Sequence, residues 1–220
     1  PDQHVFPPVS HAEPDGLLAV GGDLSPGRIL AAYAQGIFPW YARRSPILWW
    51  SPDPRMVLFP AELKVSKSMK QVLQRKVFEV TFDTDFKAVI QACAKAPRPG
   101  QAGTWLGKDM QNAYIQLHEL GFAHSVEVWR EGRIVGGLYG VAMGGVFCGE
   151  SMFASESNAS KAGFITLVEA LPAHGFGMVD CQVHTPHLES LGAREIPRVE
   201  FLKHLEAELL KPGWPGKWSR

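Results

Sequence analysis

Three polar residues in two neighbouring segments are of the types that handle an amine. Glu150 lies in one short run of strand-forming residues, and Asp180 and Gln182 lie in the next such run. Because side chains alternate along a strand, Asp180 and Gln182 share one face of the predicted sheet and Cys181 faces the other. A carboxylate and carbonyl oxygens are the groups that an ammonium ion or an attacking amine requires nearby. The alternative is a structural hydrogen-bond network, because buried polar groups cost free energy unless they are paired.

The elements around these residues predict a mixed sheet. Glu131-Gly132 and Gly144-Gly145 are good hairpin turns, so three antiparallel strands are predicted over 125–130, 134–142 and 146–153. A helix over 157–174 then leads to a strand over 179–183, which makes one parallel crossover. This order resembles the acyltransferase fold of the N-acetyltransferase (GNAT) superfamily, in which a crevice opens where the fourth and fifth strands splay apart. The polar residues of both strands would line that gap.

The whole chain predicts an α+β protein with two units. Residues 1–62 are expected to form a small N-terminal α/β domain, and residues 63–220 a larger GNAT-like domain with a central mixed sheet. In the first unit Ser25 and Pro26 open a helix, whereas the segments 38–41 and 49–55, dense in proline and tryptophan, predict packed loops. In the second, a strand is predicted over 77–82 and further helices over 66–75, 85–96, 108–120, 185–191 and 199–210. Ser66 is the predicted N-cap of the first of these helices, and Thr185, with Pro186 just inside the helix, is that of the fourth.

Composition excludes several classes of protein. The chain has 220 residues, is 45% hydrophobic and 20% charged, and contains no apolar run of the roughly 18 residues that a membrane span requires. Its first residues lack the charged-then-apolar layout of a signal peptide. Three isolated cysteines (Cys93, Cys148 and Cys181) and eight histidines without ligand spacing argue against a disulfide framework or a metal site. We therefore expect a cytoplasmic protein with no membrane contact and no metal, and a monomer, because no uncovered apolar face is evident.

The charge of the chain is unevenly distributed although its net value is zero. The segment 43–76 holds eight basic residues and two acids, an excess of six positive charges. A basic stretch on a neutral protein is either a phosphate-binding face or a solvated surface, and the residues alone leave both open.

Other catalytic patterns are absent from the sequence or weak in it. It contains no GxSxG elbow, no HExxH motif and no P-loop, and Cys181 is interpreted as a core residue rather than a nucleophile. Apolar residues such as Met152, Phe153 and Phe164 form either a flexible pocket for a side chain or ordinary core.

Several segments together resemble one family, the leucyl/phenylalanyl-tRNA–protein transferases of bacteria. Each segment is short, but they occur in order along the chain, and the ordered set is specific. The matching segments are GGDLS (21–25), GIFPW (36–40), WWSPDPR (49–55), GTW (103–105), HELG (118–121), HSVEVW (124–129), FCGESMF (147–153), NASK (158–161) and DCQ (180–182).

The resemblance implies a reaction. Such enzymes take Leu or Phe, and Met more weakly, from a tRNA ester and join it to the α-amino group of a protein that begins with Arg or Lys. The tagged protein then enters the N-end degradation pathway. No cofactor is expected, because the ester is already activated and the loop 154–157 shows no pyrophosphate cradle for acetyl-CoA. By the resemblance Asp180 and Gln182 orient the amine and assist loss of its proton. We further expect Glu150 to complete this network or to pair with the acceptor's basic side chain, and Asp180→Ala to abolish transfer in a protein that still folds.

The resemblance also implies the substrate contacts. Trp40 and Trp105 resemble aromatic residues that flank the terminal adenosine, with Tyr33 and Tyr114 at further matching positions. Ala154 departs from the family pattern, where a serine is expected to line the donor pocket. The apolar pocket for the donor side chain matches Leu138, Met152, Phe164, Leu167, Leu171 and Val179. The basic stretch becomes the face for the tRNA acceptor stem, through Arg55, Lys64, Lys67, Lys70, Arg75 and Lys76.

Three other interpretations remain. The first is a CoA-dependent acetyltransferase, with the same fold and another donor. The second is an aminoacyl transferase of the peptidoglycan type, although such enzymes usually need two domains of this kind and a longer chain. The third is an RNA-binding module without catalysis, in which Asp180 and Gln182 are structural.

Overall fold

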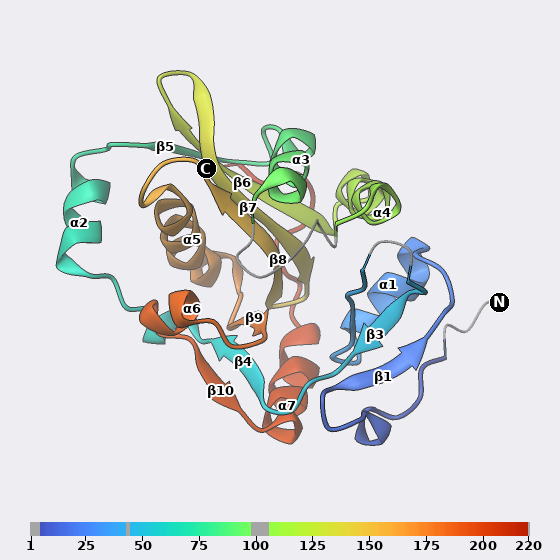
Figure 1. Ribbon diagram of the computed structural model, residues 1–220. Helices are drawn as coiled ribbons and strands as arrows, with labels where there is room; N and C mark the ends of the chain where they lie inside the picture. Colours follow the sequence, from blue (N-terminus) through green and yellow to red (C-terminus); the bar gives the residue numbers. More distant parts are fainter. Residues whose placement is uncertain (1–4, 43–44, 98–105, 220) are drawn as a thin grey trace.

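The computed structural model describes residues 5–42, 45–97 and 106–219, which form two sheets with helices around them (Figure 1). The smaller sheet has the order β1-β3-β2 and the larger one the order β10-β4-β9-β8-β7-β6-β5. The strands are β1 (Leu17–Val20), β2 (Phe38–Pro39), β3 (Leu48–Trp50), β4 (Arg55–Leu58), β5 (Glu79–Phe82), β6 (Ala123–Arg130), β7 (Arg133–Met143), β8 (Val146–Ala154), β9 (Met178–Gln182) and β10 (Arg194–Ile196). The helices are α1 (Pro26–Tyr33), α2 (Lys67–Gln74), α3 (Phe86–Lys95), α4 (Lys108–Glu119), α5 (Ala159–Ala170), α6 (Pro186–Ser190) and α7 (Arg198–Leu209), with short 3-10 turns at Val9–His11, Pro60–Glu62 and Leu171–His174.

The predicted mixed sheet is confirmed. Strands β6, β7 and β8 form an antiparallel meander, and α5 carries the chain from β8 to the parallel strand β9. One hydrophobic core lies between the sheet and α1, α3, α4 and α7, and the other lies between the opposite face and α2 and α5. The sheet is therefore buried on both faces.

The prediction of packed loops at the tryptophan-rich segments is wrong in part, because only residues 40–41 and 51–54 lie outside strands. Residues 38–39 and 48–50 are strands of the small sheet, which pairs Phe38 with Trp50 and Leu17 with Trp50. Trp49 is buried against Phe6, with ring centroids 5.0 Å apart, and its indole N–H donates to the Gly21 carbonyl at 2.9 Å. Strands this short are stabilised by tertiary packing that no local pattern shows.

Helix starts follow the predicted caps in two of three cases. The Ser66 hydroxyl accepts the Met69 N–H at 3.2 Å, and the Thr185 hydroxyl accepts the Leu188 N–H at 3.2 Å. Such caps satisfy donors that the first helical turn leaves unpaired. Ser25 precedes α1, but its side chain makes no capping hydrogen bond.

The strand β4 lies within the large sheet although it precedes the predicted domain boundary at residue 62. It pairs with β9 on one side and β10 on the other. We propose that the two units meet near residue 54, just before β4, rather than at residue 62. Within the described residues no helix is long and apolar enough to cross a membrane.

Candidate active site

A cavity opens where β8 and β9 part. The two strands pair only over three residues each, from Val146 to Cys148 and from Met178 to Asp180, and beyond that point they diverge. The cavity has a volume of about 570 Å³. Its apolar walls come from Leu138, Phe147, Met152, Phe153, Phe164, Val179, Cys181, Val183 and Leu188. The splay predicted from the order of elements is therefore present, and it leads from one face of the sheet to the other.

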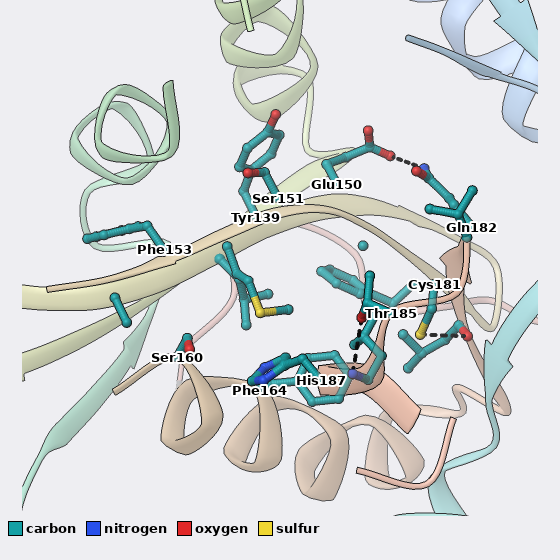
Figure 2. A pocket seen from close by; sticks show the side chains of 18 residues that line it. Tyr139, Glu150, Ser151, Phe153, Ser160, Phe164, Cys181, Gln182, Thr185 and His187 are labelled. Atoms are coloured by element: carbon teal, nitrogen blue, oxygen red, sulfur yellow. Dashed lines mark hydrogen bonds between the residues drawn. The ribbon is translucent and has the colours of Figure 1, made fainter. Parts of the chain in front are cut away.

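A bulge in β8 sets the direction of Glu150. Tyr139 pairs with Ser151 and Gly140 pairs with Gly149, so Glu150 is an extra residue in its strand. Strict alternation would put Glu150 on the same face as Met152, but the bulge re-aims it. Figure 2 shows Glu150, Ser151 and Tyr139 on one side of the strands and Phe164 on the other.

The Glu150 carboxylate is the centre of a dense hydrogen-bond network. Its Oε1 accepts the Tyr33 hydroxyl at 2.5 Å and the Gln182 amide at 2.9 Å, and its Oε2 accepts the Tyr114 hydroxyl at 3.0 Å. The two tyrosine hydroxyls lie 2.6 Å from each other. Tyr33 comes from the end of α1, Tyr114 from α4 and Gln182 from β9, so three distant segments converge on one side chain.

The geometry of this network suits a carboxyl group that titrates near neutrality. The pKa of Glu150 is raised from 4.5 to about 7, chiefly by burial; the hydrogen bonds from Tyr33, Tyr114 and Gln182 oppose this rise, and the nearby charge of Asp180 adds to it. Three close contacts join Glu150 and the two tyrosines, whereas the hydroxyls supply two protons. A proton on Glu150 completes the ring, so the protonated and ionised forms are both accommodated.

Asp180 does not open into the cavity. It is 1% exposed and is bound in bidentate fashion by Arg55, with Nε–Oδ1 at 2.9 Å and Nη2–Oδ2 at 2.7 Å. The guanidinium also donates to the Gly36 carbonyl at 2.9 Å and stacks between the rings of Phe38 and Phe201. Because its oxygens are occupied and shielded, Asp180 does not contact a group in the cavity directly, and its predicted role in orienting the amine stays a prediction.

Asp180 instead positions Gln182. Its Oδ1 accepts the backbone N–H of Gln182 at 3.0 Å. Gln182 has a φ of 64°, a left-handed conformation that is uncommon for residues other than glycine, and Cys181 before it is an extra residue opposite β4. The hydrogen bond stabilises this turn, which directs the Gln182 side chain to Glu150. Asp180 and Gln182 do share one face, as their spacing predicted.

Four of the six predicted pocket residues line the cavity: Leu138, Met152, Phe164 and Val179. Leu167 and Leu171 do not line it; both are fully buried in the core on the α5 side of the sheet. Ala154, the departure from the family pattern, lines the cavity at its rim.

The predicted adenosine contacts have different surroundings. Trp40 is 41% exposed and forms an edge contact with Trp50, so its ring is open to a ligand. Tyr33 and Tyr114 are 2% and 0% exposed, and their hydroxyls are bound to Glu150, so neither ring is open to a base in this structure. Trp105 lies outside the described residues.

Arg55 is not a phosphate contact. Its side chain is 0% exposed and its charge is paired with Asp180, which corrects the prediction from the basic stretch. The remaining basic residues are exposed on α2 and its flanks: Lys64, Lys67, Lys70, Arg75 and Lys76. This segment adjoins the cavity wall, because the Lys64 N–H donates to the Leu191 carbonyl directly after α6.

Sequence reasoning did not identify the cavity wall that α6 contributes. Thr185, His187 and Leu188 line the cavity from that side, together with Ser160 from α5. The Thr185-Pro186 helix start placed α6 in the chain, but its position over the cavity depends on tertiary packing. Among the described residues no group of three or more His, Cys, Asp or Glu side chains is placed to hold a metal ion.

A near-neutral carboxyl beside an apolar chamber defines the class of site. It suits an enzyme that passes an activated acyl group with an apolar side chain to an amine. Comparisons agree with this class: the family model described as leucyl/phenylalanyl-tRNA protein transferase matches residues 57–206, and the model for the N-terminal domain of the same proteins matches residues 22–53. The chain belongs to the leucyl/phenylalanyl-tRNA–protein transferase family and is an aminoacyltransferase.

Curated relatives of the same description cover almost the whole chain. The protein from Syntrophus aciditrophicus is 60% identical over 98% of this chain and 90% of its own length. That from Pseudomonas fluorescens is 59% identical over 94% of this chain and 92% of its own. Among solved structures, L-PGS from Bacillus licheniformis aligns with a TM-score of 0.43 at 12% identity, over 74% of this chain and 52% of that chain.

Proposed function

We propose that this enzyme transfers Leu or Phe, and Met more weakly, from aminoacyl-tRNA to the N-terminal Arg or Lys of acceptor proteins. The product is a peptide bond that marks the acceptor for N-end degradation, and the enzyme acts as a cytoplasmic monomer. The observation that carries the proposal is the pairing of Glu150 with Gln182 at the gap above the apolar cavity. Family membership supplies the reaction class.

The chemistry requires an amine, an ester and a place for one proton. The acceptor nitrogen attacks the ester carbonyl carbon, a C–N bond forms, and the C–O bond to the ribose breaks. An α-amine has a pKa of about 8, so a minority is neutral at pH 7 and reacts directly. Glu150, with a pKa of about 7, accepts the proton that the nitrogen loses and passes it to the ribose oxygen, which leaves as a hydroxyl group, so that Glu150 returns to its ionised form. Holding amine and ester together contributes most of the remaining rate enhancement.

Gln182 and the tyrosine pair have supporting roles in this proposal. The Gln182 carbonyl oxygen is available to the acceptor amine, because the amide nitrogen is committed to Glu150. Tyr33 and Tyr114 hold the carboxylate in place and stabilise its ionised form. Burial and the Glu150 charge raise the pKa of both tyrosines well above 10, so they stay protonated donors.

One assay tests the function. Labelled Leu on leucyl-tRNA is offered to a peptide that begins with Arg and to the same peptide beginning with Ala. Transfer to the Arg peptide alone is the expected result. Transfer from acetyl-CoA in place of leucyl-tRNA, or no transfer to either peptide, would refute the proposal.

Tyr33→Phe is expected to move the pH profile of transfer upward. The Tyr33 hydroxyl stabilises the ionised form of Glu150, so its removal raises the pKa of Glu150 above its value of about 7. Since the ionised form accepts the proton, the midpoint of kcat/KM against pH should rise by about one unit. The α-amine of the acceptor titrates identically with the wild type and with Tyr33→Phe, so it does not contribute to the difference between the two midpoints.

Tyr41→Phe is the matched control for this profile. Its hydroxyl donates to Asp109 rather than to Glu150, so its midpoint should stay at the wild-type value. If the pH profile of Tyr33→Phe coincides with that of Tyr41→Phe, Tyr33 does not influence the pKa of Glu150.

Replacing Lys64, Lys67 and Lys70 with Glu is expected to weaken the use of tRNA specifically. These exposed lysines lie on and before α2. If each contacts a phosphate, the slope of log affinity against log salt should fall by about three units, and KM for leucyl-tRNA should rise at least about tenfold. KM for a minimal aminoacyl-adenosine donor should not change. A matched control is Lys87→Glu with Lys95→Glu on α3, and equal effects on both donors would contradict a tRNA role for the α2 segment.

A further inference from the structure

One turn outside the large sheet is tied to both side chains that contact the acceptor amine in the proposed reaction. Helix α1 ends at Tyr33, and a capping turn closes it at Gly36. The Tyr33 hydroxyl donates to Glu150 at 2.5 Å. Three residues later, the Gly36 carbonyl accepts the Arg55 guanidinium at 2.9 Å. The turn therefore contacts the group that accepts the proton and also the ion pair that lies behind Gln182.

The link from the turn to Gln182 is a chain of buried hydrogen bonds. Arg55 uses Nη1 for the Gly36 carbonyl and its other two nitrogens for the Asp180 carboxylate, so all three guanidinium nitrogens are engaged. Asp180 in turn accepts the Gln182 N–H at 3.0 Å. Since the guanidinium is 0% exposed, water does not replace any of these partners. The position of the Gly36 carbonyl thus influences the position of the amide at Gln182.

Both backbone conformation and packing require glycine at residue 36. Its φ of 74° lies in the left-handed region, which favours glycine. Its N–H donates to the Tyr33 carbonyl at 3.1 Å, and the next N–H donates to the Ala32 carbonyl at 2.9 Å, the pattern of a Schellman cap. A Cβ on Gly36 would lie 2.9 Å from side-chain atoms of Phe201 and of Leu202 in α7. A larger residue would therefore displace the turn from α7.

We propose that Gly36 is a positioning residue of the aminoacyl transfer, whose turn fixes Glu150 and Gln182 relative to each other and so toward the acceptor amine. The inference rests on the proposed function, because it concerns the geometry of the same reaction. Tyr33 and Gly36 lie in the smaller unit of the chain, whereas Glu150 and Gln182 lie in the larger one. The smaller unit therefore completes the site even for a donor that carries no tRNA body.

Gly36→Ala is expected to reduce kcat for transfer from leucyl-adenosine to an Arg-initiated peptide by about 10- to 100-fold, because a misplacement of about 1 Å has effects of this size. Tyr33 moves with the turn, so its bond to Glu150 weakens. The midpoint of kcat/KM against pH should then rise by up to about one unit, as in Tyr33→Phe. KM for the peptide should rise because Gln182 is displaced, whereas KM for leucyl-adenosine should not change.

A double variant tests whether Tyr33 carries the effect on the pH profile. If Gly36 influences the titration of Glu150 through the Tyr33 hydroxyl, Tyr33→Phe with Gly36→Ala should have the midpoint of Tyr33→Phe alone. Independent effects would add instead. Gly36→Ala with Leu202→Ala, which removes one of the two close contacts, replaces the single variant if that does not fold, and Leu202→Ala alone should keep the wild-type midpoint.

Gly121→Ala is the matched control. Gly121 has a φ of 84° and closes α4 with the same pair of hydrogen bonds, from its own N–H to the His118 carbonyl and from the Phe122 N–H to the Leu117 carbonyl, both at 2.9 Å. Alanine there has the same unfavourable φ, but its Cβ would have no atom within 4 Å. The variant should lose stability in chemical denaturation and keep the wild-type midpoint and peptide KM.

Two results would overturn the inference. The first is a midpoint and a peptide KM in Gly36→Ala equal to those of Gly121→Ala, which would leave Gly36 a purely structural role. The second is an additive midpoint shift in the double variant, which would exclude Tyr33 as the link. A wild-type enzyme that transfers no Leu to the Arg peptide refutes the proposed function itself, whereas an active wild type with either of these two results refutes only the role of Gly36.

Discussion

Asp180→Ala lowers the free energy of unfolding by about 3–5 kcal/mol, as expected when one partner of a buried ion pair is removed. The substitution leaves the Arg55 guanidinium, which is 0% exposed, with the Gly36 carbonyl and two aromatic rings but no counter-charge. It also removes the acceptor that holds the turn at Gln182. Chemical denaturation followed by tryptophan fluorescence measures the change.

The double variant Arg55→Met with Asp180→Ala is the control for this expectation. An apolar side chain in place of the guanidinium removes the stranded charge, so the double variant should be more stable than Asp180→Ala alone. If Asp180→Ala lowers the free energy of unfolding by less than about 1 kcal/mol, the ion pair between Arg55 and Asp180 does not hold β9 in place. Loss of transfer in Asp180→Ala is therefore expected together with loss of stability, which corrects the expectation of an intact but inactive protein.

Glu150→Gln is expected to reduce kcat/KM by about 10²- to 10⁴-fold at neutral pH, the usual contribution of a general base. Glutamine preserves the size of the side chain, and its oxygen can accept the Tyr33 hydroxyl while its NH2 donates to the Tyr114 oxygen, but it does not accept a proton. Transfer from a minimal donor to an Arg peptide, measured across pH, gives the effect without contributions from tRNA binding. Turnover near that of the wild type would exclude Glu150 as the base.

The same variant has a distinct signature in stability. The pKa of Glu150 is raised in the folded protein from 4.5 to about 7, so its contribution to stability is fully present below pH 4.5 and is lost as pH rises through 7. Glu150→Gln should lack this dependence and keep its stability at pH 8. Glu156→Gln, which removes an exposed carboxylate bound to Arg130, is the control and should change neither stability nor activity.

Local patterns were sufficient for most regular elements of the larger unit, but they did not predict its strands β4 and β10. Alternating β-branched residues and glycine turns predicted the β6–β8 meander, and the Ser66 and Thr185 caps predicted two helix starts. These features succeed because the relevant interactions span only a few residues. The strands of the small sheet could not be predicted, since Phe38 and Leu17 meet Trp50 from different parts of the chain.

The sequence predicted which residues make up the site, but not which partners their side chains bind. Glu150, Asp180 and Gln182 do share one face, yet the partner of Asp180 is Arg55, which lies 125 residues away in the sequence. A basic residue inside a basic stretch gives no sign that it is buried. Nor does alternation reveal the bulges at Glu150 and Cys181, which decide where the carboxylate and the amide point.

The divergence of β8 and β9 links the choice of donor side chain to the position of the reacting ester. Phe164 lies on one face of the sheet and Glu150 with Gln182 on the other, and all three line the same cavity. In the proposed reaction the carbonyl of the bound amino acid therefore lies in the gap between the two strands. The depth to which a side chain enters the chamber then sets the height of its carbonyl relative to the attacking nitrogen. A donor side chain that is too short to fill the cavity, or too long to enter it, would misplace the ester relative to the attacking nitrogen. The proposed reaction would therefore select donor side chains by their length.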